Sequence, residues 1–138
     1  MTIYWGDGTS TSTNPSGGAA QSSGTWSVSW NSFGSGSISV HASEYIAVGD
    51  LVHFNIRFNI SWTYDSDQIQ FSLPYTNGGD QVIVSAIKTD DSSGAIGIVG
   101  KIDNGSSWCQ TRTYNNDGLT YRSNTSVGQF IVSGTYQK

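Results

Sequence analysis

The sequence predicts an all-β protein, built as an antiparallel β-sandwich behind a flexible N-terminal arm. Two observations predict this fold: apolar and polar residues alternate strictly in the middle of the chain, and turn-forming residues recur at short intervals. Alternation with a period of two places all apolar side chains on one face of an extended strand. Such a strand belongs to a sheet that packs against a second layer on one side only. At 138 residues the chain is long enough for one such domain.

The arm and its linker are predicted over residues 1–24. An apolar tip, Ile3, Tyr4 and Trp5, precedes a tract that is rich in Gly, Ser, Thr and Asn. A tract of this composition buries too little apolar area to offset its ordering entropy. As a coil it would span on the order of 20–25 Å. We therefore predict that the apolar tip is an anchor attached through a flexible linker. The alternative is a plain disordered terminus.

The sandwich domain is predicted over residues 25–138, and its clearest strand covers residues 51–62. The apolar positions of this strand are Val52, Phe54, Ile56, Phe58, Ile60 and Trp62. They alternate with His53, Asn55, Arg57, Asn59 and Ser61. The apolar set should face the core, and the polar face is left to solvent or to a contact between protomers.

Turn signals divide the rest of the domain into further strands. Runs of Gly, Asn and Asp tolerate positive φ and mark the connections. The predicted strands span residues 25–30, 37–40, 45–48, 68–75, 82–87, 95–102, 108–114, 119–122 and 127–136. A series of roughly eight to ten short strands favours a double-layer sandwich.

Charge and cysteine content exclude several functions. The net charge is −4, and the six Lys and Arg residues are scattered singly, so we predict no nucleic-acid partner. The weak negative field disfavours anionic membranes, and no apolar stretch approaches the roughly 20 residues that span a bilayer. We therefore predict no membrane partner. The single Cys109 excludes an internal disulfide, and we expect a buried thiol.

Catalytic chemistry has little support in the sequence. His41 and His53 lack neighbours that would orient or tune a general base. Glu44 is the only glutamate, and the aspartates lie in turn-like segments where aspartate is expected anyway. Neighbouring aspartates at residues 65–67 and 90–91 lack the spacing of a calcium loop. We predict no catalytic residue, no metal site and no cofactor.

One strand and the turn after it combine aromatic, amide and charged side chains, which are typical of shallow recognition sites. Residues 108, 110, 112 and 114 share one face of this strand, which leads into the turn at 115–118. The predicted recognition residues are Tyr114, Asn115, Asn116, Asp117 and Tyr121. The alternative is that Trp108 and Tyr114 are core residues.

Four motifs occur in an order that resembles small β-sandwich domains of bacteriophage virion proteins. They are Gly24-Thr25-Trp26, Tyr45 with Gly49-Asp50-Leu51-Val52, Phe71-Ser72-Leu73-Pro74-Tyr75, and Val132-Ser133-Gly134-Thr135-Tyr136. The opening residues 3–9 also resemble the start of tail-associated proteins of phages that infect cyanobacteria. The chain departs from the family pattern because no proline follows Trp26 two residues on, and Gly49-Asp50 replaces Gly-Asn.

This resemblance implies a homotrimeric, jelly-roll-like domain of the virion, assembled in the host cytoplasm, without enzymatic activity or cofactor. Our leading hypothesis is a tail-fibre or receptor-binding module that contacts the host surface, where a surface glycan is the candidate ligand. One alternative is a capsid decoration (cement) protein, which the arm would anchor to the head through Ile3, Tyr4 and Trp5. A second alternative is a glycan-hydrolysing enzyme, against which the lack of a credible carboxylate pair counts. The expected partners are further copies of the chain and other virion proteins.

Overall fold

The computed structural model describes residues 3–4, 10–11, 20–31, 37–60, 69–88, 98–115, 118–121 and 128–138. Every regular element in these segments is a β-strand, and neighbouring strands pair antiparallel. No helix in this part of the chain has the length and hydrophobicity required to cross a bilayer. The prediction of an all-β, antiparallel sandwich-like fold is confirmed.

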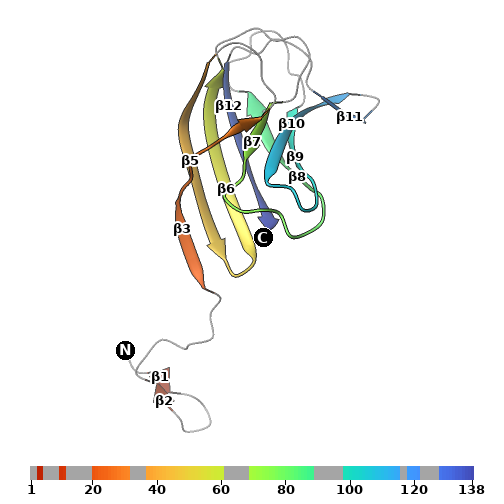
Figure 1. Cartoon of the computed structure of the whole chain (residues 1–138). Coiled ribbons are helices and arrows are strands. Elements are labelled where there is room, and N and C mark those ends of the chain that lie inside the picture. The colour runs from red at the N-terminus through yellow and green to blue at the C-terminus, as the bar shows by residue number, and fades with distance from the viewer. Residues whose placement is uncertain are drawn as a thin grey trace.

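Ten strands form one continuous sheet (Figure 1). They are β3 (Gln21–Thr25), β4 (Trp30–Asn31), β5 (Ile38–Val48), β6 (Leu51–Ile60), β7 (Gln70–Ser72), β8 (Val82–Lys88), β9 (Ile98–Ile102), β10 (Trp108–Asn115), β11 (Gly118–Tyr121) and β12 (Gly128–Gln137). Their order is β3-β5-β6-β12-β8-β9-β10-β7-β4, with β11 paired to β10. β1 (Ile3–Tyr4) and β2 (Ser10–Thr11) pair with each other in a separate two-stranded sheet.

The sheet curls so that β4 and β7 lie over β6. The Trp30 ring of β4 lies 4.9 Å from the Phe58 ring of β6 and 6.1 Å from the Phe71 ring of β7. The segment between β3 and β4 joins the two sides of the curl. The Trp26 backbone N–H donates to the Ser43 carbonyl of β5 at 3.3 Å, and its indole N–H donates to the Ser72 carbonyl of β7 at 2.8 Å. The two layers of the sandwich are therefore halves of a single sheet.

The core lies inside this curl, and β6 supplies the largest share of it. Its five apolar residues from Val52 to Ile60 are at most 3% exposed, whereas His53, Arg57 and Asn59 are exposed. The predicted inward face of this strand is confirmed, although Trp62 lies outside the described residues. Aromatic rings dominate the core: Phe54, Phe58, Phe71, Phe130 and Tyr136. Full burial stabilises an aliphatic or Phe side chain by about 1.5–3 kcal/mol.

Two glycines allow neighbouring strands to pack around Val84 of β8. A Cβ atom added at Gly134 of β12 would lie 2.3 Å from Val84 Cγ1. A Cβ atom added at Gly100 of β9 would lie 2.4 Å from Val84 Cγ2. The branched Val84 side chain thus fills the space of two absent side chains, which explains why both flanking strands carry glycine.

Three strand predictions are corrected. Residues 37–40 and 45–48 belong to one strand, β5, which continues through a β-bulge between Val40 and Ala42. Residues 25–30 are not one strand, because the ladder is interrupted between Thr25 of β3 and Trp30 of β4. Residues 21–24, which we assigned to the arm, form most of β3. The buried thiol expected at Cys109 is confirmed, and burial raises its pKa.

Candidate functional site

The strands of the sandwich run between two different ends. At one end, which we call the terminal end, the β5–β6 turn binds two segments of backbone. One is the segment through which the chain enters the sandwich, and the other is the segment after β12. The Gly49 N–H donates to the Ala20 carbonyl at 2.9 Å, and the Lys138 N–H donates to the Asp50 carbonyl at 2.7 Å. Gly49 has φ 57°, a conformation that glycine adopts without strain.

The opposite end, which we call the hairpin end, carries the hairpin of β10 and β11. β10 begins at Trp108 near the terminal end and runs for 8 residues, about 25 Å at the rise of a β-strand. In Figure 1 β11 lies at the upper right, far from the C-terminus. A ligand at the hairpin would therefore lie far from the point where the arm joins the sandwich.

The hairpin confirms the predicted turn after β10. Backbone pairing places Tyr114 opposite Leu119, Asn115 opposite Gly118 and Arg112 opposite Tyr121. This register brings Tyr114, Asn115 and Tyr121 together on one hairpin, where they are placed by their backbone. Asn116 and Asp117 lie outside the described residues. Of the predicted anchor, Ile3 and Tyr4 form β1, and Trp5 lies outside the described residues.

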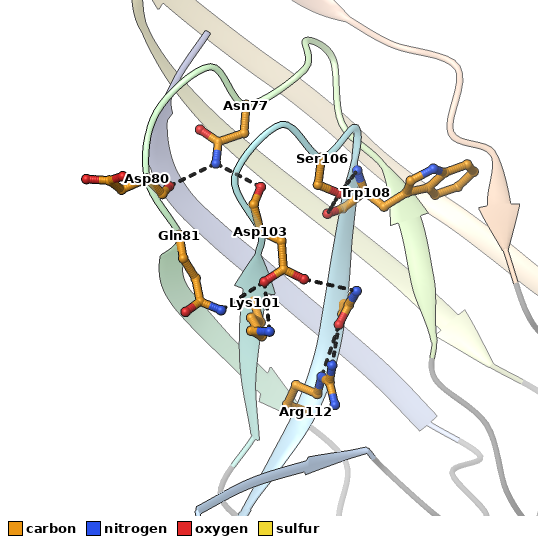
Figure 2. A network of polar contacts seen from close by, with 9 residues as sticks. Asn77, Asp80, Gln81, Lys101, Asp103, Ser106, Trp108 and Arg112 are labelled. Atoms are coloured by element: carbon orange, nitrogen blue, oxygen red, sulfur yellow. Dashed lines mark hydrogen bonds and ion pairs between the residues drawn. The ribbon is translucent and has the colours of Figure 1, made fainter.

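A polar network runs along β10 toward the hairpin (Figure 2). The Asp103 carboxylate accepts hydrogen bonds from Gln81 Nε2 at 2.9 Å and from Gln110 Nε2 at 3.5 Å, and it pairs with Lys101 Nζ at 2.8 Å. Gln110 Oε1 in turn accepts from Arg112 Nη2 at 2.6 Å and from Arg112 Nε at 3.1 Å. The interaction with Lys101 is the main reason why the pKa of Asp103 is lowered.

This network gives two residues of the predicted recognition face a structural role. Gln110 and Arg112 connect the turn after β9 to the base of the hairpin, and Arg112 is only 7% exposed. The core side of β10 is formed by Cys109 and Thr111, both fully buried. Trp108 is half-buried on the other side of the strand and is not part of the core cluster, so the alternative that it is a core residue is wrong. The same alternative for Tyr114 is not decided, because its side chain lies outside the described part of the structure.

Asn77 connects the loops of the terminal end through hydrogen bonds. The sequence analysis did not predict a role for this residue. Its side chain is fully buried, donates to the Asp80 carbonyl at 2.9 Å and the Asp103 carbonyl at 3.0 Å, and accepts from the Gly79 N–H at 3.1 Å. The sequence signal was an Asn-Gly-Gly-Asp turn, which indicates a loop but not that the asparagine is buried. We assign Asn77 a structural role.

The outward surface of β5 and β6 has a shallow hollow of about 250 Å³. It is lined by Glu44, Tyr45, Ile46, His53 and Asn55. Within the described part of the chain, Asn55 Oδ1 is buried there without a hydrogen-bond partner, and Ile46 is 47% exposed beside it. The outward face of β6 is polar in the sequence, but Ile46 of β5 lies directly opposite His53 of β6. The surface that the two strands share is therefore partly apolar. The hollow combines apolar contact with an unsatisfied acceptor, which suits non-covalent binding.

The described segments hold no group of three or more His, Cys, Asp or Glu side chains placed to bind a metal ion. Comparisons of the chain with protein-family models, with curated proteins and with solved structures gave no match.

Proposed function

We propose that this chain is a structural module of a bacteriophage virion, of the tail-fibre or receptor-binding type, and that it acts as a trimer. The motif order described above supports a virion domain. The geometric observation that carries the proposal is the separation of the two ends: the arm joins the sandwich at Ala20, beside the C-terminus, and the β10–β11 hairpin lies at the opposite end. An anchored protein with this arrangement presents the hairpin outward.

The hairpin has the chemistry for a surface glycan. Tyr114 and Tyr121 offer aromatic faces for the apolar faces of sugar rings, while Asn115, Asn116 and Asp117 offer directional hydrogen bonds. The Asp103–Gln110–Arg112 network supports the base of the hairpin. A rigid base reduces the ordering cost of binding at the turn.

Trimer formation has support in the exposed aliphatic side chains of the sheet. Val48 is 44% exposed, Leu51 58%, Ile83 50% and Ile87 56%. Ile87 of β8 also pairs directly with Ile131 of β12. Exposed aliphatic side chains of this kind are candidates for an interface with another protomer.

The test is a binding experiment on the full chain with Asn115, Asn116 and Asp117 all replaced by Ser. The ligands are a panel of cyanobacterial cells and their extracted surface polysaccharides. We expect affinity to fall by about tenfold or more, because several hydrogen bonds are lost together. The melting temperature should stay unchanged, since the turn lies at the end of the hairpin. The matched control is Asn104→Ser, an exposed turn residue at the terminal end, which should bind like the unmodified chain.

Two outcomes would count against this function. Unchanged binding by the folded triple variant would move the site away from the hairpin. If neither protein binds cells or polysaccharide, the decoration role is favoured, because an arm at the terminal end serves equally to attach the domain to a capsid. Immunogold labelling of particles distinguishes a position on the head from one on the tail.

A further inference from the structure

β3 is an edge strand of the sheet, and among the described residues it pairs only with β5. It stands at one end of the strand order, and all five of its residues are exposed. Natural edge strands are usually protected by charged side chains, proline or a bulge, because an open edge pairs readily with another chain. β3 has the sequence Gln-Ser-Ser-Gly-Thr, without charge or proline, and the bulge in β5 lies in its pairing with β6.

The hydrogen bonds on either side of β3 show which of its backbone groups face outward. The Ala20 carbonyl accepts from Gly49, and the Trp26 N–H donates to Ser43, so both residues point toward β5 or the turn that follows it. Backbone groups alternate in direction along a strand, so Ser22 and Gly24 also point toward β5. The N–H and C=O groups of Gln21, Ser23 and Thr25 therefore point toward the open edge. No hydrogen bond to these groups occurs within the described residues.

We propose that β3 pairs antiparallel with β3 of a second copy of this chain, about a two-fold axis beside Ser23. In this register Ser23 lies opposite the partner's Ser23, and Gln21 lies opposite the partner's Thr25. Each outward-facing residue then exchanges both backbone hydrogen bonds with its opposite, so the pattern is self-complementary. β3 itself carries no charged side chain that would oppose the approach, and Ser and Gly at residues 22–24 add little bulk. A second copy therefore satisfies every outward group of the strand.

This contact is distinct from the proposed trimer and does not depend on it. A three-fold axis cannot place a strand opposite its own copy, whereas a two-fold axis does so necessarily. The contact therefore yields a dimer if the chain is otherwise monomeric, and it joins two trimers if the trimer forms. In either case the particle contains an even number of chains.

The experiment measures the mass of the full chain by light scattering over a dilution series that reaches the high micromolar range, since a short strand pair forms a small interface. We expect an even number of chains at high concentration. Ser23→Lys and Ser23→Glu should each halve the mass, because the substituted residue faces an identical charge across the axis. An equimolar mixture of the two variants should restore the original mass. The control Asn104→Lys, at an exposed turn away from β3, should leave it unchanged.

A mass of one or three chains at the highest concentration would overturn the proposal, and so would a Ser23→Lys variant with the original mass. Ser23→Lys and Ser23→Glu would also lower the mass if they detached β3 from β5. Ser23→Pro separates this cause from the loss of the contact between copies. The Ser23 N–H points away from β5, so proline removes an outward donor without breaking a β3–β5 bond. This variant should keep the melting temperature of the unassociated chain and halve the mass. A variant that keeps its association would contradict the assigned strand register.

Discussion

Tyr136 illustrates how one buried side chain joins distant parts of the sandwich. It is 2% exposed on β12, and its hydroxyl donates to the Tyr75 carbonyl at 2.8 Å and accepts from the Tyr75 N–H at 3.0 Å. These bonds tie the last strand to the loop after β7. The Tyr at the end of the Val-Ser-Gly-Thr-Tyr motif therefore has a packing role in this chain.

Tyr136 should make stability depend on alkaline pH. Burial raises its pKa from 10.0 to about 12 in the folded chain. Its contribution is complete below pH 10 and is lost as pH rises from 10 through 12, because the unfolded chain releases the proton first. This difference in pKa between the folded and unfolded chain corresponds to about 3 kcal/mol of stability. Urea unfolding of the native chain from neutral pH to pH 12 should show this loss.

Tyr136→Phe is the comparison for this experiment. It should be less stable at neutral pH by about 1–2 kcal/mol, because the hydrogen bonds to Tyr75 are lost. Its stability should fall less steeply above pH 10. Some slope should remain, since burial also raises the pKa of the Cys109 thiol. An identical slope in both proteins would show that Tyr136 is not the titrating group.

At the scale of a single element, β6 carries the clearest prediction. Ile56 is fully buried, so Ile56→Asp places an unpaired charge in the core and should cost more than about 4 kcal/mol, enough to unfold the domain. Asn59→Asp on the exposed face of the same strand should change stability by less than about 0.5 kcal/mol. Circular dichroism melts of the two variants provide the measurement. A soluble, cooperatively melting Ile56→Asp protein would contradict the assigned inward face.

Strands were predictable where the side chains that alternate toward the core are also the large apolar ones. β6 and β12 follow this rule. β10 breaks it, because the small side chains of Cys109 and Thr111 face the core. The larger Trp108, which is half-buried, and Arg112, which is buried in the polar network, lie on the opposite face of the strand. Near Trp26 the alternation is real, but the ladder with β5 ends at the Trp26 backbone N–H, and the indole N–H donates to the Ser72 carbonyl of β7. Neither feature is visible to a pattern based on hydrophobicity alone.

The candidate site was predictable only in its local part. The turn after β10 follows from Asn and Gly in sequence, and its backbone pairing confirms a hairpin. The support beneath it joins Gln110 of β10 to Asp103, which follows β9, and Asp103 to Gln81, which precedes β8, so it depends on which strands are neighbours. The hollow beside Asn55 likewise depends on the pairing of β5 with β6. The Gly49-Asp50 turn predicts that these two strands pair, but it does not show which side chains meet in the hollow.

At the scale of the whole molecule, the arm and the sandwich should be separable. Among the described residues, the first backbone bond into the sandwich is made by Ala20. Deletion of residues 1–18 should therefore change the free energy of unfolding by less than about 0.5 kcal/mol, while incorporation into particles falls. Chemical denaturation and a particle sedimentation assay measure the two effects.

A longer deletion, through residue 25, provides the control. It also removes β3 and its ladder with β5, so it should lower the midpoint of unfolding clearly. If the shorter deletion were equally destabilising, the arm would have to contribute to the fold. Normal incorporation of the shorter protein would show that Ile3, Tyr4 and Trp5 are not an anchor.

The β5–β6 turn holds Ala20 and Lys138 side by side at the terminal end of the sandwich. Consecutive residues, Gly49 and Asp50, bind the backbone of Ala20 and of Lys138. A few added residues could therefore join residue 138 to residue 20, and the chain could be opened at another loop as a circular permutant. For the same reason the whole sandwich can be inserted into a surface loop of an unrelated protein, with both connections emerging at one point and the hairpin displayed at the far side.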